Sequence, residues 1–232
     1  MKGLAITLFL MAALCGYAQE QMHMPPRVGM EVPEDVRQSS LYGKSIVLFG
    51  DSYVQNSQCP IEESWHYKLA AKYNMDYHNY GLNGNCIAYD RTDEGCGAPL
   101  YQRVGELPEA ADYVIVCCGH NDAVIMQRNG ESPAFFRSRM EILCRELAEK
   151  YPHAKMGFVT PWRIPPDMLL AMQEVCTEYN MALFDATRHS GIHVRFRGFR
   201  CLYFQGPDDM AHLNARGHDL VAPKMEKFLL AL

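Results

Sequence analysis

Short apolar runs and longer stretches with helical spacing alternate along most of the chain. Apolar runs of strand length lie at residues 45–49, 76–80, 113–118, 155–160 and 181–185, the second being the weakest. Apolar residues three or four positions apart lie at 62–74, 132–151, 165–180 and 213–232. Strands that alternate with helices of this length are typical of a parallel sheet covered on both faces. The pattern therefore predicts an α/β fold, a three-layer α/β/α sandwich around a five-stranded parallel sheet.

The first residues follow a different pattern. Residues 1–18 combine Lys2, an apolar stretch at 4–14 and the small residues Gly16 and Ala18. This is the pattern of a secretory signal cleaved after Ala18, and its apolar part is too short to span a bilayer. We therefore expect an exported protein without stable membrane insertion, periplasmic or extracellular if the source is bacterial.

Lipid attachment at Cys15 is the alternative for this segment, and it fits poorly because small residues are expected beside such a cysteine, where Leu14 stands. After the signal, residues 19–43 contain prolines without a clear period and are predicted to form an irregular lead-in. The length of the remainder predicts one domain over residues 44–232.

Charge and cysteine content narrow the class of protein. The chain has 22 basic and 27 acidic residues, a net charge of −5, which argues against a nucleic-acid partner. No Cys-x-x-Cys motif occurs, so a zinc ribbon or a thioredoxin-type centre has no support. Buried thiols are expected at Cys117, Cys118 and Cys144. An exported chain can form disulfides, and one pair among the loop residues Cys59, Cys86 and Cys96 is expected, without a choice of pair.

Polar residues gather directly after the predicted strands. The segments at the ends of four of them are Gly50-Asp51-Ser52, Asn79-Tyr80-Gly81-Leu82-Asn83-Gly84, Gly119-His120-Asn121-Asp122 and Thr160-Pro161-Trp162. Ligands of parallel sheets bind outside the carboxyl ends of the strands. These segments are therefore expected to meet at one edge of the sheet.

The same segments contain the groups that a serine esterase needs. Ser52 can act as a nucleophile, and Asp209 and His212 are three residues apart, a spacing that can place acid and base on one side of a helical turn. Gly84 can offer an unobstructed backbone N–H and Asn121 a side-chain amide to an oxyanion. Taken singly, each also fits a bland role in a turn, a cap or a loop. The Gly-x-Ser-x-Gly elbow of α/β-hydrolases is absent, since Val54 replaces its second glycine.

Four ordered segments resemble the SGNH hydrolases, also called GDSL-type esterases and lipases. They are "FGDSYVQN", "NYGLNGN", "GHND" and "DMAHLN". The resemblance implies a flavodoxin-like sandwich without a metal or other cofactor. It implies Ser52 as nucleophile, His212 as base and Asp209 as its orienting acid. It also implies an oxyanion hole made by the Ser52 N–H, the Gly84 N–H and the Asn121 side chain.

Departures from the family pattern and the predicted export bear on the substrate. Tyr53 replaces the leucine of the GDSL motif, His120 replaces a smaller residue, and Leu213 replaces a frequent proline. Tyr53, His120 and Trp162 are expected to contact substrate. Segment 188–204 interleaves arginines with aromatic residues, which favours an acidic or hydroxyl-rich polymer. Its alternative is a solvated loop or hairpin whose aromatic side chains pack inward.

The sequence thus predicts a serine esterase that hydrolyses short-chain esters, above all acetyl esters, on carbohydrate. Its partner would be an acylated small molecule or polysaccharide, and no oligomeric state is predicted. An acyltransferase, a lipase or thioesterase of the same fold, and a non-catalytic glycan-binding protein are the alternatives. No metal site is predicted, because the histidines show no ligand spacing; those considered were His66, His78, His189, His193 and His218.

Overall fold

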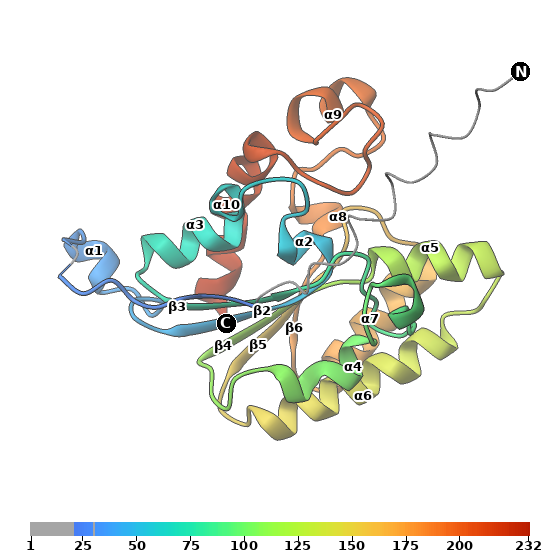
Figure 1. Cartoon of the computed structure of the whole chain (residues 1–232), viewed down its shortest axis with the longest axis horizontal. Helices are drawn as coiled ribbons and strands as arrows, with labels where there is room; N and C mark the ends of the chain where they lie inside the picture. Colours follow the sequence, from blue (N-terminus) through green and yellow to red (C-terminus); the bar gives the residue numbers. More distant parts are fainter. Residues whose placement is uncertain (1–20, 30) are drawn as a thin grey trace, which may run out of the picture.

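The computed structural model describes residues 21–29 and 31–232, so the predicted signal peptide lies outside the described residues. Its centre is a six-stranded sheet in the order β1-β3-β2-β4-β5-β6, seen along its edge in Figure 1. The strands are β1 (Met22–Met24), β2 (Ser45–Gly50), β3 (Asp76–Gly81), β4 (Tyr113–Cys117), β5 (Lys155–Val159) and β6 (Ala182–Phe184). Strands β2 to β6 are parallel, which confirms the predicted five-stranded parallel sheet.

Ten α-helices accompany the sheet in the part of the chain that the structure describes. They are α1 (Glu34–Arg37), α2 (Ser52–Gln55), α3 (Trp65–Lys72), α4 (Leu100–Arg103), α5 (His120–Asn129), α6 (Ala134–Lys150), α7 (Pro166–Glu178), α8 (Ala186–His189), α9 (Arg197–Tyr203) and α10 (Ala215–Ala231). None of these helices has the length and apolar character of a membrane span.

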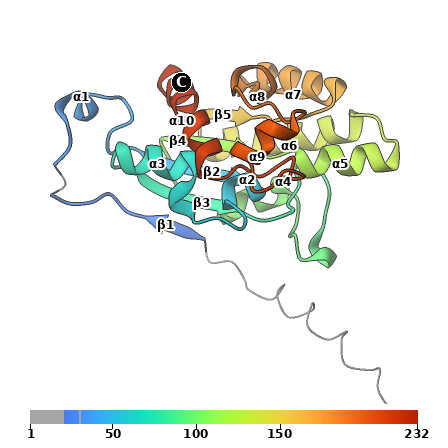
Figure 2. The same cartoon turned by 90° about the horizontal axis from the view of Figure 1, so that it is seen from above.

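The interior has two hydrophobic cores, one on each face of the sheet, and the side chains of β2 point alternately into them. Ile46 and Leu48 point into one core with residues of α3 and α10, whereas Val47 and Phe49 point into the other with residues of α4, α6 and α7. Successive side chains of a strand leave opposite faces of the sheet, so a strand that is apolar at every position must be covered twice. Figures 1 and 2 show the resulting three layers, as the apolar pattern predicts.

The predicted irregular lead-in is partly wrong. Residues 22–24 form β1, which pairs antiparallel with β3 at the edge of the sheet, as Figure 2 shows, and residues 34–37 form α1. A strand of three residues is too short to display a period, and its pairing with β3 depends on residues more than fifty positions away.

The cysteines differ in part from expectation. All eight described cysteines are free thiols, so the expected disulfide among Cys59, Cys86 and Cys96 is not formed in this structure. Cys117, Cys118 and Cys144 are buried, as predicted. Their burial raises the pKa of each thiol well above its ordinary value, which keeps the thiols protonated and unreactive.

Candidate active site

Ser52 lies where β2 ends and α2 begins. Gly50 closes the strand against β4, and a side chain on residue 50 would overlap the carbonyl oxygen of Cys117. The next residue, Asp51, caps α2 with its carboxylate, which accepts a hydrogen bond from the Tyr53 N–H at 2.9 Å. Asp51 therefore fixes the turn between β2 and α2 through a backbone hydrogen bond. Ser52 is consequently the first residue of α2 and lies at the carboxyl edge of the sheet.

His212 connects Ser52 to Asp209. Its Nε2 lies 3.0 Å from the Ser52 hydroxyl oxygen, and its Nδ1 lies 3.0 Å from an Asp209 carboxylate oxygen. A carboxylate accepts only, so the neutral ring carries its proton on Nδ1 and offers the lone pair of Nε2 to the serine hydroxyl. The structure thus brings together the three residues that the sequence singled out.

The helical turn expected between Asp209 and His212 is wrong. The two residues lie in a loop, in which one carboxylate oxygen of Asp209 accepts hydrogen bonds from the N–H groups of Ala211 and His212 at 2.8 and 2.9 Å. Burial alone would raise the pKa of Asp209, but these bonds and the His212 ring outweigh burial and lower it. Asp209 therefore stays ionised and can stabilise a protonated His212.

The loop carrying His212 is anchored from both sides. The Trp162 indole donates a hydrogen bond to the Ala211 carbonyl at 2.9 Å, and the His212 carbonyl accepts one from the backbone N–H of Gln205 at 3.0 Å. Immediately afterwards, Asn214 caps α10 by accepting a bond from the Gly217 N–H. The imidazole is therefore held by its backbone as well as by Asp209.

Asn121 lies in the first turn of α5, close to the loop that follows β3. One amide hydrogen is directed at the Asn85 carbonyl at 3.0 Å, whereas the contact of the same nitrogen with Asp51 is long, at 3.5 Å. A hydrogen bond of that length is weak. One hydrogen of the Asn121 amide is therefore loosely held and can be donated to another acceptor.

Gly84 occupies the turn after β3, which is tied to β2 by the bond from the Leu82 N–H to the Gly50 carbonyl. Its φ of +74° lies in the left-handed region, and a side chain there would also meet the Cys96 sulfur. Both observations explain why glycine occupies this position. No hydrogen bond joins the Gly84 N–H to another described residue.

Two buried residues that sequence reasoning missed fix this turn. The Asp122 carboxylate accepts bonds from the Ile87 and Ala88 N–H groups at 2.9 and 2.8 Å, and burial raises its pKa to about 6. Asn85 donates to the carbonyls of Cys96 and Ala98. Asn85 ends the segment "NYGLNGN" and Asp122 ends the segment "GHND". The sequence therefore contained both residues, but their contacts become visible only in the folded structure.

Comparison with known proteins identifies the chain's family. The model of the GDSL-like lipase/acylhydrolase family matches residues 48–220. The chain belongs to this family. It is therefore a carboxylic ester hydrolase with the SGNH hydrolase fold. No curated protein matches the chain.

Solved structures similar to this GDSL-family chain support the same fold. A protein from Lactobacillus plantarum is 21% identical with a TM-score of 0.70, over 82% of this chain and 98% of its own. The acetyl xylan esterase AlAXEase is 19% identical with a TM-score of 0.59, over 80% and 99%. An inhibitor-bound aryl esterase from M. smegmatis is 16% identical with a TM-score of 0.59, over 82% and 100%.

The three residues expected to contact substrate differ in exposure. Tyr53 and Trp162 are more than nine-tenths buried and their rings stack 5.3 Å apart, with the Tyr53 ring edge-on to His212. They form the wall behind the imidazole of this GDSL-family site and offer substrate little surface. His120 is less buried and contacts the Tyr53 hydroxyl. Burial, and then the nearby His212, lower its pKa, so His120 is neutral near pH 7.

Segment 188–204 has both buried and exposed members, and its second half forms the helix α9 instead of the loop or hairpin that was the alternative. Arg200 is buried and donates to the Pro207 carbonyl at 2.7 Å, and Phe199 packs on Tyr203. Other members of the segment are exposed and line a cavity of about 410 Å³ together with Trp162. Its basic and aromatic lining includes Trp162, Arg163, Arg188, His193, Arg195 and Phe196.

Proposed function

We propose that the protein is a serine esterase that removes acetyl and other short acyl groups from carbohydrates. The observation that carries the proposal is the continuous chain of hydrogen bonds from Ser52 through His212 to Asp209, each 3.0 Å long. Within the GDSL family, this arrangement supplies the nucleophile, the base and the orienting acid of an acyl-enzyme mechanism.

In the first half-reaction, the Ser52 oxygen attacks the ester carbonyl carbon as its proton moves to His212 Nε2. The carbonyl oxygen becomes an oxyanion, and we assign its stabilisation to the Ser52 N–H, the Gly84 N–H and the loosely held hydrogen of Asn121. Collapse of the tetrahedral species breaks the bond to the alcohol oxygen, which takes the proton from His212. The alcohol leaves and the acyl group remains on Ser52.

In the second half-reaction, His212 takes a proton from water as the water oxygen attacks the acyl carbon. The carboxylic acid then leaves as the proton returns to the Ser52 oxygen. Asp209, held ionised by its backbone donors, stabilises the imidazolium in both halves.

The carbohydrate preference rests on the basic and aromatic cavity beside the triad. Trp162 lines both this cavity and the small one that contains Ser52 and His212. Arg163 and Arg195 have no carboxylate partner within the part of the chain that the structure describes, and no acidic residue lines the cavity. Unpaired guanidinium groups can bind sugar hydroxyls and carboxylates. Similarity to an acetyl xylan esterase also supports a carbohydrate ester, and the predicted secretory signal supports action outside the cytoplasm.

The first test compares wild type with Ser52→Ala, using p-nitrophenyl acetate and acetylated oligosaccharides. We expect acetate release from the sugars by wild type and a loss of several orders of magnitude in the variant. Ser138→Ala is the matched control, because Ser138 is exposed on α6 and bonds only to its own helix. A well-folded wild type that hydrolyses no ester would contradict the proposal and favour a glycan-binding protein.

Product analysis separates hydrolysis from transfer. Adding an unacetylated oligosaccharide acceptor to the same reaction should not divert acetate from water. Acetylated acceptor as the main product would replace the esterase with an acyltransferase. A strong preference for long-chain over acetyl esters would favour a lipase or thioesterase.

The arginines of the cavity predict a preference for acidic over neutral acetylated oligosaccharides. Arg163→Gln combined with Arg195→Gln should raise KM several-fold for acetylated oligosaccharides that contain uronic acids, and leave neutral ones unchanged. Arg145→Gln is the control, since Arg145 is exposed on α6 away from the cavity. Equal effects on neutral and acidic substrates would remove the charge-based part of the preference and leave the esterase assignment intact.

A further inference from the structure

A second cluster of ionisable side chains lies at the edge of the sheet, on β1 and β3. His23 and His78 are directly opposite each other in the antiparallel pair, and their rings stack with centroids 4.4 Å apart. Asp76 precedes His78 by two residues, so its side chain leaves the same face of β3. The ladder therefore places two imidazoles and one carboxylate side by side.

Both imidazoles direct the same nitrogen at the one carboxylate. His23 Nε2 lies 2.6 Å from one oxygen of Asp76, and His78 Nε2 lies 3.3 Å from the other. The potential ligand atoms of the three residues all lie within 4.8 Å of one another. Within residues 21–29 and 31–232, no other group of three histidine, cysteine or acidic side chains meets this condition.

We propose that His23, Asp76 and His78 form a binding site for a divalent transition metal ion, with zinc the best match. Two imidazoles and a carboxylate are a donor set that zinc prefers, with metal–ligand distances of about 2.0–2.2 Å. Such distances place neighbouring ligand atoms about 3.4 Å apart around a tetrahedral ion. The 3.3 Å contact already has this spacing, and the 2.6 Å contact needs only a small rotation of the exposed His23 ring.

The site would act on a short strand at the edge of the sheet. β1 has three residues, and a metal ion would bind the middle one to two residues of β3. Because His23 and Asp76 are 53 positions apart, the ion would close a long loop and stabilise the folded state, which alone has the ligands preassembled.

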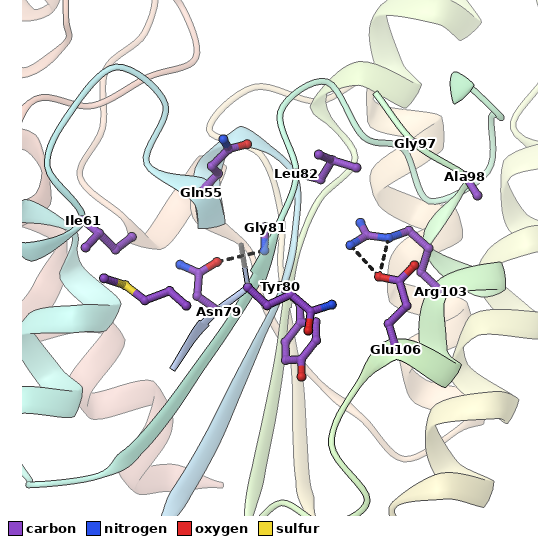
Figure 3. A pocket seen from close by; sticks show the side chains of 12 residues that line it. Gln55, Ile61, Asn79, Tyr80, Gly81, Leu82, Gly97, Ala98, Arg103 and Glu106 are labelled. Carbon is purple, nitrogen blue, oxygen red and sulfur yellow. Dashed lines mark hydrogen bonds and ion pairs between the residues drawn. The ribbon is translucent and has the colours of Figure 1, made fainter. Parts of the chain in front are cut away.

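The same strand borders a cavity near the candidate active site. Gln21 and Met22 line a cavity of about 470 Å³ together with Gln55, Gly81 and Leu82, and Figure 3 shows the last three around it. Gln55 ends α2, the helix that Ser52 begins. Metal binding would therefore fix one wall of a cavity that reaches the helix carrying the nucleophile, without placing the ion in the catalytic step.

The test measures metal binding directly on untagged, chelator-treated protein. Titration with Zn²⁺ should give one saturable site, and Co²⁺ should give the visible absorption bands of a low-coordinate site with nitrogen ligands. Excess Zn²⁺ should raise Tm by about 4 °C or more. His23→Gln, Asp76→Asn and His78→Gln should each weaken the affinity at least about tenfold.

His153→Gln serves as the matched control, because His153 is exposed in the turn before β5 and should bind zinc like wild type. The Tm of each metal-free variant establishes that it is folded, and His23, with half of its side chain exposed, can be changed without opening the core. The proposal is overturned if wild type shows no saturable site, or if the three variants bind zinc as tightly as His153→Gln. In that outcome the cluster is a hydrogen-bonded contact between β1 and β3 only.

Discussion

Two histidine–aspartate clusters of this protein use the same groups for different ends. At the carboxyl edge, Asp209 holds Nδ1 of His212 and leaves Nε2 to face the Ser52 hydroxyl. At the β1 edge, Asp76 interacts with Nε2 of both His23 and His78, and no hydroxyl of the described residues is a partner of either ring. In each cluster the ring nitrogen away from the carboxylate keeps its lone pair. Only in His212 does a serine hydroxyl face that nitrogen, so only His212 is placed as a base beside a nucleophile.

The clusters also differ in how their acids are held. Asp209 accepts two backbone N–H bonds from its own loop, which fix it independently of His212. Asp76 has the two imidazoles as its side-chain partners, so a metal ion can replace them as the carboxylate's neighbour. A fixed acid suits a base that must keep its orientation, whereas an acid held only by ligands suits a site that rearranges around an ion.

The largest expected effect is the loss of activity on removing the imidazole of His212, which should leave the other cluster unchanged. His212→Ala should lower kcat for p-nitrophenyl acetate by about 10⁴-fold or more, because the serine loses its base. The same variant should keep the wild-type zinc affinity, since His212 is not one of the three proposed ligands. His153→Ala is the control for activity. Retention of more than about a tenth of wild-type kcat would exclude His212 as the base.

A smaller loss is expected at the oxyanion donor. Asn121→Ala should lower kcat by about 10²- to 10³-fold with little change in KM, because the amide acts on charge that develops in the transition state. Asn129→Ala changes the other end of the same helix α5, where the side chain is exposed and bonds to Glu131, and should retain full activity. Equal kinetics for the two variants would remove Asn121 from the oxyanion hole.

The third expected effect is a pH-dependent contribution of Asp51 to the free energy of unfolding. Burial raises the pKa of Asp51 to about 7, so between about pH 4 and pH 7 the folded state holds a proton that the unfolded state has released. The contribution of Asp51 is present at low pH and is lost as pH rises through about 7. The free energy of unfolding of wild type relative to Asp51→Asn should therefore fall across this window.

The measurement must compare the free energy of unfolding of wild type with that of Asp51→Asn, because other buried groups change the stability of both proteins with pH in the opposite direction. Burial lowers the pKa of His66 and His218 to about 3, and their contributions grow as pH rises from about 3 to 6.5. These contributions cancel when denaturant unfolding of wild type and Asp51→Asn is compared at each pH. A flat difference curve would mean that Asp51 is ionised in the folded protein throughout.

One of the two clusters could be predicted from the sequence and the other could not. Most of the parallel strands are rich in apolar residues, with β3 the exception, and polar residues follow them directly, so the fold class and Ser52 were visible without coordinates. The Asp209/His212 pair was visible from its spacing of three residues. Sequence spacing gave no sign of the pairing of His23 with His78, because β1 has three residues and its partner lies 55 positions away. The burial of Tyr53 and Trp162 was missed for a related reason, since aromatic residues after a strand fit a site wall and a site surface equally.

The central claim is that Ser52 is the nucleophile, and covalent labelling tests it most directly. An alkyl fluorophosphonate incubated with the protein should lose fluoride and add one phosphonyl group per chain, located on Ser52 by peptide mass spectrometry. We expect no adduct in Ser52→Ala and far slower labelling in His212→Ala, with both variants folded by circular dichroism. A label on another residue, or a folded wild type that stays unmodified while it hydrolyses esters, would exclude Ser52 as the nucleophile.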